Sequence, residues 1–374
     1  MKKPNVAIAS VLKPLKDARA YYRLGLSLRE TNKYHLNIIG FSLKNVPNEK
    51  DISFFTLFDK NRTHWKRLLV SLKFVQTIQK TKPKILIVTS YELLPAAVLI
   101  KAILRFRLIY DVQENYGLNI QENQTQKGWK RHVAKYWIRG IEKLAHRFVD
   151  HYFFAESCYR HEFPYIDKFT VLENKFPGKP KPILPVQYRQ GQCLTFLISG
   201  TITEVYGIKE AIIWFTEALK HQPNLRLKII GYCPMKSYRI GLDKIIQGIP
   251  QIQAKISDSA ITYPEILVAY QHSDIIMLPY YQIPSISPKV PSKLYESLAL
   301  GKPFLHSPNP KWASLSDRYQ AGVEVEFSDL GSVKKHLDEI VARPFFTGGM
   351  DGLPFWNEHE NQRLLGVIVK YLDD

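Results

Sequence analysis

Short apolar runs alternate with amphipathic segments along most of the chain. Apolar runs of about four to eight residues between helical patterns are typical of parallel sheets whose strands are buried on both faces. In the first half, strands are expected at 5–10, 35–41, 85–89 and 108–112, and helices at 17–31 and 93–104. This order of elements predicts a doubly wound α/β domain.

The alternation stops at 175–192, which is rich in proline and is interpreted as an extended linker. It then resumes. Strands are expected at 194–199, 225–231, 275–278 and 303–306, and helices at 208–221, 263–272, 292–300 and 356–371. We therefore predict two Rossmann-like α/β domains with a ligand cleft between them. The predicted boundaries are 1–176 and 193–350, with a linker at 177–192 and a C-terminal helix within 351–374.

Composition excludes several classes of protein. Hydrophobic residues make up 45% and charged residues 23%, which excludes a disordered or collagen-like chain. Cys158, Cys193 and Cys233 are too few and too scattered for a disulfide framework, so a reducing compartment is expected. The apolar region 84–112 is interrupted by Glu92 and three basic residues and is too short to span a membrane. The first residues lead into an apolar hexamer without a signal-peptide pattern, so a cytoplasmic location is expected.

The net charge of +18 is concentrated in one half of the chain. Residues 1–180 carry 32 Lys+Arg against 15 Asp+Glu, whereas residues 181–374 carry 20 against 19. This asymmetry predicts that the first domain faces an anionic surface.

Two segments, 61–84 and 128–148, account for much of this charge. Both are basic and both contain an apolar helical stripe, as shown by Trp65 with Leu68 and by Trp129 with Trp137. Basic amphipathic helices with interfacial tryptophan are typical of anionic membrane surfaces. The residues expected to face the membrane are Arg62, Trp65, Lys66, Arg67, Lys130, Arg131 and Lys135. The alternative is that each apolar stripe packs on the sheet of its domain.

The clearest candidate for chemistry is the segment 291–303, Pro-Ser-Lys-Leu-Tyr-Glu-Ser-Leu-Ala-Leu-Gly-Lys-Pro. Ser292 is expected to cap a helix that ends at Gly301. A helix N-terminus at the carboxyl end of a sheet offers backbone N–H groups and a positive dipole end to a diphosphate, and Lys293 adds a charge there. Glu296, one turn further on, can accept hydrogen bonds from a ribose diol. The alternative is a capped helix with a solvated lysine.

This segment closely resembles the donor-binding helix of GT-B glycosyltransferases, in particular bacterial members of glycosyltransferase family 4. The resemblance continues in chain order over nearly the whole sequence. It is carried by Lys13–Arg19, Leu24–Leu28, Tyr110–Glu114, Glu173–Lys175, Ser199–Thr201 with Tyr206-Gly207, Ile229–Tyr232 and Asp274–Tyr280.

The resemblance implies the GT-B fold, with an acceptor-binding N-terminal domain, a nucleotide-sugar-binding C-terminal domain and a C-terminal helix that returns to the first. It implies retaining transfer of a hexose from a nucleoside-diphosphate sugar, with no metal or other cofactor. The implied donor-binding residues are Gly200, Tyr206, Gly207, Gly231, Tyr232, Ser292, Lys293, Leu294 and Glu296. Among them, Lys293 and the amides of residues 292–294 would stabilise the leaving diphosphate.

The resemblance and the basic first domain together point to a lipid-linked or oligosaccharide acceptor. The implied role is polysaccharide, capsule or lipopolysaccharide synthesis by a cytoplasmic protein peripherally bound to the inner face of the cell membrane. No recognised nucleic-acid-binding module is present, so no nucleic-acid partner is expected. No cluster of residues has the spacing of metal ligands.

Three departures from the family pattern bear on the site. The first Glu of the Glu-x7-Glu pair falls on Pro288, and Gln113 stands where members often have His. The basic pair common after the first strand of the second domain is not obvious. Lys293, Lys209 or Arg19 would then supply the diphosphate charge.

The first domain offers its own candidates. No G-x-G-x-x-G pattern follows its first strand, which disfavours a dinucleotide there. Glu114 follows the strand at 108–112 and is expected to act as an acid/base or to contact the acceptor hydroxyl. Asp17, Arg19 and Gln113 are expected on the acceptor side, with a surface salt bridge as the alternative for Asp17 and Arg19.

The sequence is also compatible with other functions. A nucleotide-sugar epimerase of the same fold would need no acceptor and would have little use for a basic domain. A non-catalytic protein that binds nucleic acid or a membrane would need only the charge. The replacements at Pro288 and Gln113 also leave room for a degenerate, inactive member of the family.

Overall fold

The computed structural model describes residues 3–42, 46–59, 69–122 and 128–373. The chain divides into two compact units. Unit 1 comprises residues 1–177 and 356–374, and unit 2 comprises residues 178–355.

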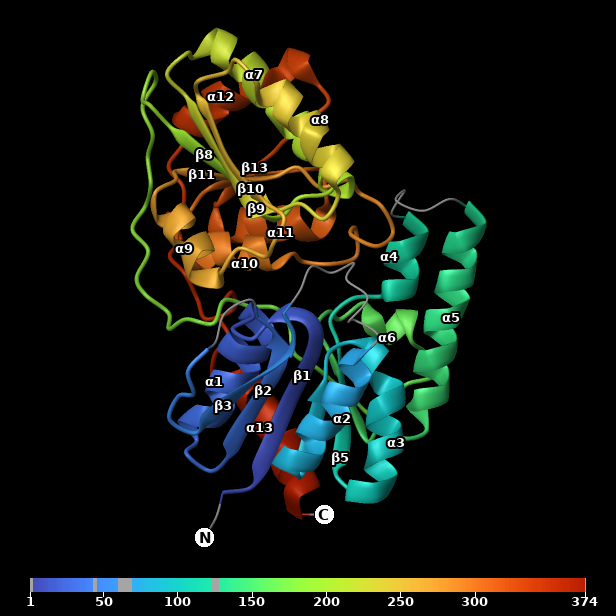
Figure 1. The fold of residues 1–374 in the computed structure, drawn as a ribbon. Coiled ribbons are helices and arrows are strands. Elements are labelled where there is room, and N and C mark those ends of the chain that lie inside the picture. The colour runs from blue at the N-terminus through green and yellow to red at the C-terminus, as the bar shows by residue number, and fades with distance from the viewer. Residues whose placement is uncertain (1–2, 43–45, 60–68, 123–127, 374) are drawn as a thin grey trace. The chain divides into compact units, whose positions relative to one another are not determined.

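Unit 1 contains a sheet of seven parallel strands among the described residues, in the order β3-β2-β1-β4-β5-β6-β7 (Figure 1). The strands are β1 (Asn5–Pro14), β2 (His35–Phe41), β3 (Ile52–Phe58), β4 (Ile85–Val88), β5 (Arg107–Val112), β6 (His151–Phe154) and β7 (Phe169–Val171). The helices are α1 (Leu26–Glu30), α2 (Val70–Thr81), α3 (Leu94–Leu104), α4 (Tyr116–Glu122), α5 (Gly128–His146), α6 (Tyr159–Glu162) and α13 (Glu358–Asp373).

Alternate residues of β1 point into two separate cores, one on each face of this sheet. Ala7 and Ala9 lie in the core that α2 and α3 cover. Val6 and Ile8 lie in the core that α1 and α13 cover. Both faces are therefore dry, which explains why the strands read as nearly continuous apolar runs.

The C-terminal helix α13 belongs to unit 1, as the resemblance implied, and lies against its sheet (Figure 1). Just before it, the Trp356 backbone N–H donates to the Phe176 carbonyl at 2.7 Å. Lys175 forms a 2.6 Å ion pair with the buried Glu360, and the Tyr371 hydroxyl donates to the Asp150 carbonyl. These contacts attach α13 and the residues just before it to unit 1.

Unit 2 contains a parallel sheet of six strands in the order β10-β9-β8-β11-β12-β13. The strands are β8 (Thr195–Thr201), β9 (Arg226–Tyr232), β10 (Ile252–Ser257), β11 (Ile275–Leu278), β12 (Phe304–His306) and β13 (Gly322–Glu324). The helices are α7 (Ile208–His221), α8 (Lys236–Ile246), α9 (Tyr263–Gln271), α10 (Ser292–Ala299), α11 (Pro310–Tyr319) and α12 (Val333–Ala342). One continuous apolar core runs through this unit and includes the fully buried Trp214 and Trp312.

Residues of the segment 178–192 make contacts within unit 2. Val186 and Phe345 form a β-bridge with backbone hydrogen bonds of 3.0 and 2.7 Å. The buried Tyr188 donates its hydroxyl hydrogen bond to the Asp274 carbonyl. This part of the chain is therefore anchored to unit 2 at Val186 and Tyr188.

Two expectations about helices differ from the structure. Residues 17–31 were expected as one helix but form a π-helix at Ala18–Gly25 followed by α1, with Asp17 capping the π-helix through the amides of Arg19 and Ala20. Ser292 was expected to cap the donor helix, but it is the first residue of α10, and Pro291 occupies the cap position without a side-chain cap. Because Pro291 has an extended backbone and takes the cap position, the helix starts one residue earlier than a Ser292 cap would place it.

Candidate functional site

The candidate donor site lies where the strand order of unit 2 reverses. β8 and β11 are neighbours, and the chain leaves them toward opposite edges of the sheet. In open α/β sheets, this switch point at the carboxyl ends of the strands is where ligands bind. At these ends, Gly200 is the penultimate residue of β8, and Tyr280 lies just after β11.

Lys293, in the first turn of α10, reaches the backbone at the end of β8. A Cβ atom placed on Gly200 would lie 2.6 Å from Lys293 Cε and 2.8 Å from its Nζ. Gly200 also has φ +94°, a conformation that side chains with a Cβ rarely adopt. Only glycine therefore lets the ammonium group occupy this place.

Two tyrosine rings flank the same ammonium group. Tyr206 and Tyr280 lie 4.8 Å apart between ring centres, and Lys293 Nζ lies 6.0 and 5.8 Å from them. Burial lowers the pKa of Lys293, but Tyr280 and Glu296 more than offset this, so the pKa lies above its ordinary value. The site therefore holds a positive charge at neutral pH, which suits a diphosphate.

Glu296 and Leu294 are buried on α10, whereas Ser292 and Tyr232 are half-buried. The Leu294 amide donates to the Pro291 carbonyl at 2.9 Å within the first turn. The amides of Ser292 and Lys293 precede this bond in the helix, so a ligand at the N-terminus would meet those two. The Leu294 amide, which was also expected to contact the leaving diphosphate, donates to Pro291 instead.

Gly207 and Gly231 serve the packing of unit 2. A Cβ atom on Gly207 would lie 1.8 Å from the Pro279 carbonyl oxygen, and Gly207 has φ +62°. A Cβ atom on Gly231 would lie 2.1 Å from the Gly200 carbonyl oxygen. Both glycines therefore allow close contact between two segments of the protein's own backbone. Lys209, the other cation considered, is exposed on α7.

In unit 1, Arg19 and Asp111 form a buried ion pair. Arg19 donates to both carboxylate oxygens, with the shortest contact at 2.6 Å, and the two residues are 3% and 0% exposed. Its remaining donors reach the Leu172 carbonyl at 2.7 Å and Asn174 at 3.0 Å. Arg19 is therefore held inside the unit, unlike the surface salt bridge considered from the sequence.

Two other acceptor-side candidates, Gln113 and Glu114, follow Asp111 closely in the chain. The buried Gln113 donates its side-chain amide to Asp111 at 2.8 Å, and its Oε1 accepts a hydrogen bond from Lys13. Glu114 is exposed and accepts a 3.0 Å hydrogen bond from Asn119. The structure thus brings Gln113 and Arg19 together through Asp111, a residue that the sequence analysis did not single out as functional.

Comparisons with known proteins bear on the fold. No family model and no curated protein sequence matches the chain. Sucrose-phosphate synthase from Thermosynechococcus elongatus superposes with a TM-score of 0.62 at 13% identity, covering 99% of this chain and 97% of that chain. Anabaena HepE in complex with UDP and glucose superposes with a TM-score of 0.61 at 12% identity, covering 97% and 99%. The alignments span both units. The chain has the GT-B fold.

The GT-B fold is shared by transferases and epimerases. The UDP-GlcNAc 2-epimerase from Neisseria meningitidis bound to UDP-GlcNAc also matches, with a TM-score of 0.55 at 13% identity over 99% of this chain and 100% of that chain. The fold is therefore confirmed for this chain, and the reaction has to be argued from its own residues.

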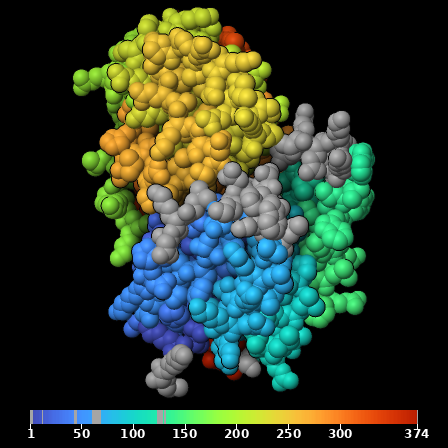
Figure 2. Space-filling model, viewed as in Figure 1, coloured from blue at the N-terminus to red at the C-terminus, as the bar shows by residue number. Residues whose placement is uncertain are grey.

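The helices α3 and α5 lie side by side in the N-terminal GT-B unit (Figures 1 and 2), and they expose large apolar side chains to solvent. On α5, Trp137 is 70% and Leu144 is 77% exposed, and on the neighbouring α3, Leu99 and Ile103 are similarly exposed. We call this surface the α3/α5 face. Its exposed large apolar residues are Leu99, Ile103, Trp129, Val133, Tyr136, Trp137, Leu144 and Phe148. Most of the α5 stripe is therefore not used to pack on the sheet.

The residues expected to face a membrane fall only partly within this surface. Arg62, Trp65, Lys66 and Arg67 lie outside the described residues. The backbone of Lys130 and Arg131 belongs to α5, and Lys135 donates to Gln121. Within the part of the chain that the structure describes, no helix has both the length and the apolar character needed to cross a bilayer.

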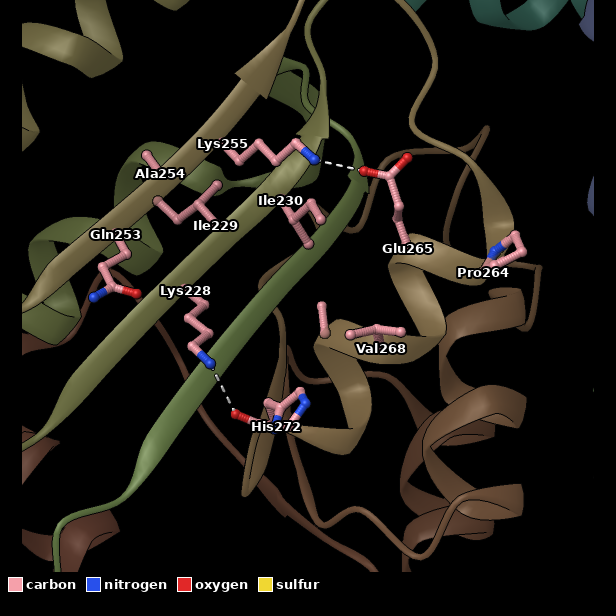
Figure 3. Close-up of a pocket in the computed structure, with 11 residues that line it drawn as sticks. Lys228, Ile229, Ile230, Gln253, Ala254, Lys255, Pro264, Glu265, Val268 and His272 are labelled. Carbon is pink, nitrogen blue, oxygen red and sulfur yellow. Dashed lines mark hydrogen bonds and ion pairs between the residues drawn. The ribbon is translucent and has the colours of Figure 1, made fainter.

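A hollow in the C-terminal GT-B unit is lined by none of the residues of the donor motif 291–303 (Figure 3). Its volume is about 520 Å³, and it lies between β9, β10 and α9. Lys255 pairs with Glu265 at 2.5 Å at one end, and Lys228 donates to the His272 carbonyl at the other (Figure 3). None of its lining residues is a candidate from the sequence. Among the described residues, no group of three or more His, Cys, Asp or Glu is placed to hold a metal ion.

Proposed function

We propose that this protein is a retaining glycosyltransferase of hexosyltransferase type that takes its sugar from a nucleoside-diphosphate donor bound to unit 2. The proposal rests on one observation: the ammonium group of Lys293 lies against Gly200 at the switch point of the sheet. A cation beside a helix N-terminus at this position is suited to a diphosphate.

In this proposal, Lys293 and the amides of Ser292 and Lys293 stabilise the charge that develops on the leaving diphosphate. Glu296 accepts hydrogen bonds from the ribose hydroxyls. Tyr206 flanks the diphosphate site, and Tyr232 borders it at the end of β9. Charge stabilisation by preorganised donors of this kind requires no metal ion.

The acceptor is proposed to bind on unit 1, where Glu114 contacts the reacting hydroxyl. Glu114 is exposed and follows the carboxyl end of β5, the edge at which ligands of parallel sheets bind. Gln113 and Asp17 border the same edge, whereas Arg19 contributes by holding Asp111 and Gln113 in place.

The acceptor is proposed to be a lipid-linked saccharide used for cell-surface polysaccharide, capsule or lipopolysaccharide. The support is the α3/α5 face, because exposed tryptophan and leucine beside basic residues suit an anionic membrane surface. Across α2, α3 and α5 the only acid is Glu142, and it is buried beneath α5 where it accepts a hydrogen bond from Tyr110. The protein would bind the inner face of the cell membrane peripherally.

A thermal-shift screen tests the donor site most simply. UDP, GDP and ADP, each free and as a sugar ester, are added to the wild-type chain and to the Lys293→Ala and Glu296→Ala variants. We expect one nucleotide series to raise the melting temperature of the wild type and to lose this effect in both variants. The absence of stabilisation by every nucleotide would overturn the proposal.

The epimerase alternative has its own readout. An epimerase converts a nucleotide sugar without consuming an acceptor, so incubation of the chain with UDP-GlcNAc alone would yield a second nucleotide sugar. We expect no such product, because the α3/α5 face would be without purpose in an enzyme that acts on soluble donors only. An epimerised product in the absence of lipid would replace the transferase proposal with the epimerase.

A further inference from the structure

The loop that joins β11 to the donor helix, residues 281–291, is fastened to the start of α11. The loop begins after Tyr280 and ends at the first turn of α10, so it borders the candidate donor site within the same unit. Lys289 is its only charged residue, and Pro288 stands where related chains carry a glutamate.

Asn309 caps α11 and holds the loop with the same side chain. Its Oδ1 accepts from the Lys311 and Trp312 amides at 3.0 and 3.2 Å. Its Nδ2 donates to the Gln282 side chain at 2.6 Å and to the Ser287 carbonyl at 2.9 Å. Asn309 is only 3% exposed, so all four hydrogen bonds are shielded from water.

Two more side chains of α11 hold the next two residues of the loop. The indole N–H of the fully buried Trp312 donates to the Lys289 carbonyl at 2.7 Å. The ammonium group of Lys311 donates to the Pro288 carbonyl at 2.6 Å. Three consecutive carbonyls, from Ser287 to Lys289, are therefore held by the first residues of one helix. We refer to Asn309, Lys311 and Trp312 as the α11 anchor.

The backbone N–H groups of the same three residues also have partners. The Ser287 amide donates to Ile283 at 2.8 Å, and the Lys289 amide donates to Ile286 at 3.0 Å. Pro288 has no N–H group. Each backbone polar group of residues 287–289 is thus engaged inside the protein, and these hydrogen bonds restrain this part of the loop without a ligand.

We propose that Asn309 and Trp312 are positioning residues that hold this loop against the sugar half of the donor. The proposal rests on the function proposed above. The loop leads into α10, whose N-terminus would bind the diphosphate. The sugar is attached to the far side of the diphosphate, so the loop would lie next to the sugar. Loss of the α11 anchor should then weaken binding of a nucleotide sugar more than binding of the nucleotide alone.

Two conservative variants release the loop with little change of shape. Asn309→Asp keeps the oxygen that caps α11 but removes the N–H donor and sets a carboxylate against the Ser287 carbonyl. Trp312→Phe removes the indole N–H that reaches Lys289. The matched control is Trp214→Phe, because Trp214 is equally buried in unit 2 and its indole N–H has no hydrogen-bond partner among the described residues.

Two measurements on the full chain test the proposal. Hydrogen exchange of residues 281–291 reports whether the α11 anchor holds the loop, without any ligand. Calorimetry then compares the Kd of UDP, GDP or ADP with the Kd of its glucose ester. For both variants we expect about tenfold faster exchange, about tenfold weaker binding of the ester and less than about twofold change for the nucleotide. Trp214→Phe should leave all three values near those of the wild type.

Unchanged exchange in the two variants, or equal losses for nucleotide and ester, would overturn the inference. A wild-type chain that binds none of the nucleotides would instead overturn the proposed function, and the exchange comparison would still decide whether α11 holds the loop. The two failures are therefore distinguishable.

Discussion

The side chain of Lys293 lies across the backbone of Gly200, so that a Cβ atom on Gly200 would come within 2.6 Å of Lys293 Cε. The two residues are distant in sequence and meet because α10 begins at the carboxyl end of the strand next to β8. The position of Lys293, the only cation that we assign to the diphosphate, therefore depends on the glycine conformation at residue 200.

The Gly200→Ala substitution should damage both folding and donor binding. Alanine at φ +94° is strained and displaces Lys293, so we expect a loss of about 1–3 kcal/mol in the free energy of unfolding. Nucleotide affinity should fall at least about tenfold. Urea denaturation and calorimetry measure the two effects. Gly241→Ala is the control, because Gly241 lies within α8 with open space around it and alanine should stabilise that helix. Wild-type nucleotide affinity in Gly200→Ala would contradict the assignment of Lys293.

The buried pair of Arg19 and Asp111 predicts a large effect on stability. Asp111→Asn leaves the Arg19 charge buried without its partner, and we expect a loss of about 3–5 kcal/mol in the free energy of unfolding. Chemical denaturation measures this loss. Lys255→Ala, which removes an exposed pair with Glu265, should cost less than about 1 kcal/mol. Similar small losses in both variants would show that the Arg19 pair is not essential to the packing of unit 1.

Much of the architecture could be predicted because buried elements leave a strong apolar pattern. The bounds of α7 and β11 are as predicted, and both elements are largely buried. Two elements of unit 2 that were not predicted, β10 and α8, bury little. The edge strand β10 is buried only at Ile252 and Ile256, and α8 buries only Leu242. Such elements carry too few apolar residues to reveal their period.

The candidate site was predictable only where it is local in sequence. Gly200 and Lys293 each stand in a recognisable motif. The contacts of Asp111 with Arg19 and of Asn309 with the loop join residues that are 92 and 22 positions apart. Such residues come together only through the order of the strands in the fold, and the spacing of a motif does not predict that order.

Glu142 predicts a dependence of stability on pH. Burial raises the pKa of its carboxyl from 4.5 to about 7, although Tyr110 and Arg139 act in the opposite direction. Because the pKa is higher in the folded state, the protonated form contributes stability that is complete below pH 4.5 and is lost as the pH rises through about 7. Over this range we expect the free energy of unfolding of the wild type to fall by up to about 3 kcal/mol, and we expect Glu142→Gln not to show this fall.

The measurement is the free energy of unfolding of wild type and Glu142→Gln between pH 4.5 and 8. Glu30→Gln, at an exposed position of unit 1, is the control and should follow the wild-type curve. Parallel curves for wild type and Glu142→Gln would show that Glu142 does not titrate near neutral pH.

The α3/α5 face predicts binding to anionic membranes. Trp137→Ala combined with Leu144→Ala removes two exposed apolar side chains, so folding stability should change by less than about 1 kcal/mol. The affinity for vesicles that contain phosphatidylglycerol, measured by co-sedimentation, should fall at least about tenfold. The reason is that the variant has less apolar surface to insert into the lipid. Leu184→Ala, at a similarly exposed leucine of unit 2, should bind like the wild type. Equal binding of the wild type to neutral and anionic vesicles, or no binding to either, would refute the membrane surface.

The most direct test of the central claim is transfer of sugar to lipid. The full chain is incubated with a bacterial lipid extract and radiolabelled UDP-, GDP- or ADP-linked sugars, and the label that enters the organic phase is counted. We predict that one donor labels the lipid fraction with the wild type and not with Lys293→Ala. Labelled lipid that forms equally with Lys293→Ala, or the absence of labelled lipid with every donor, would contradict the account.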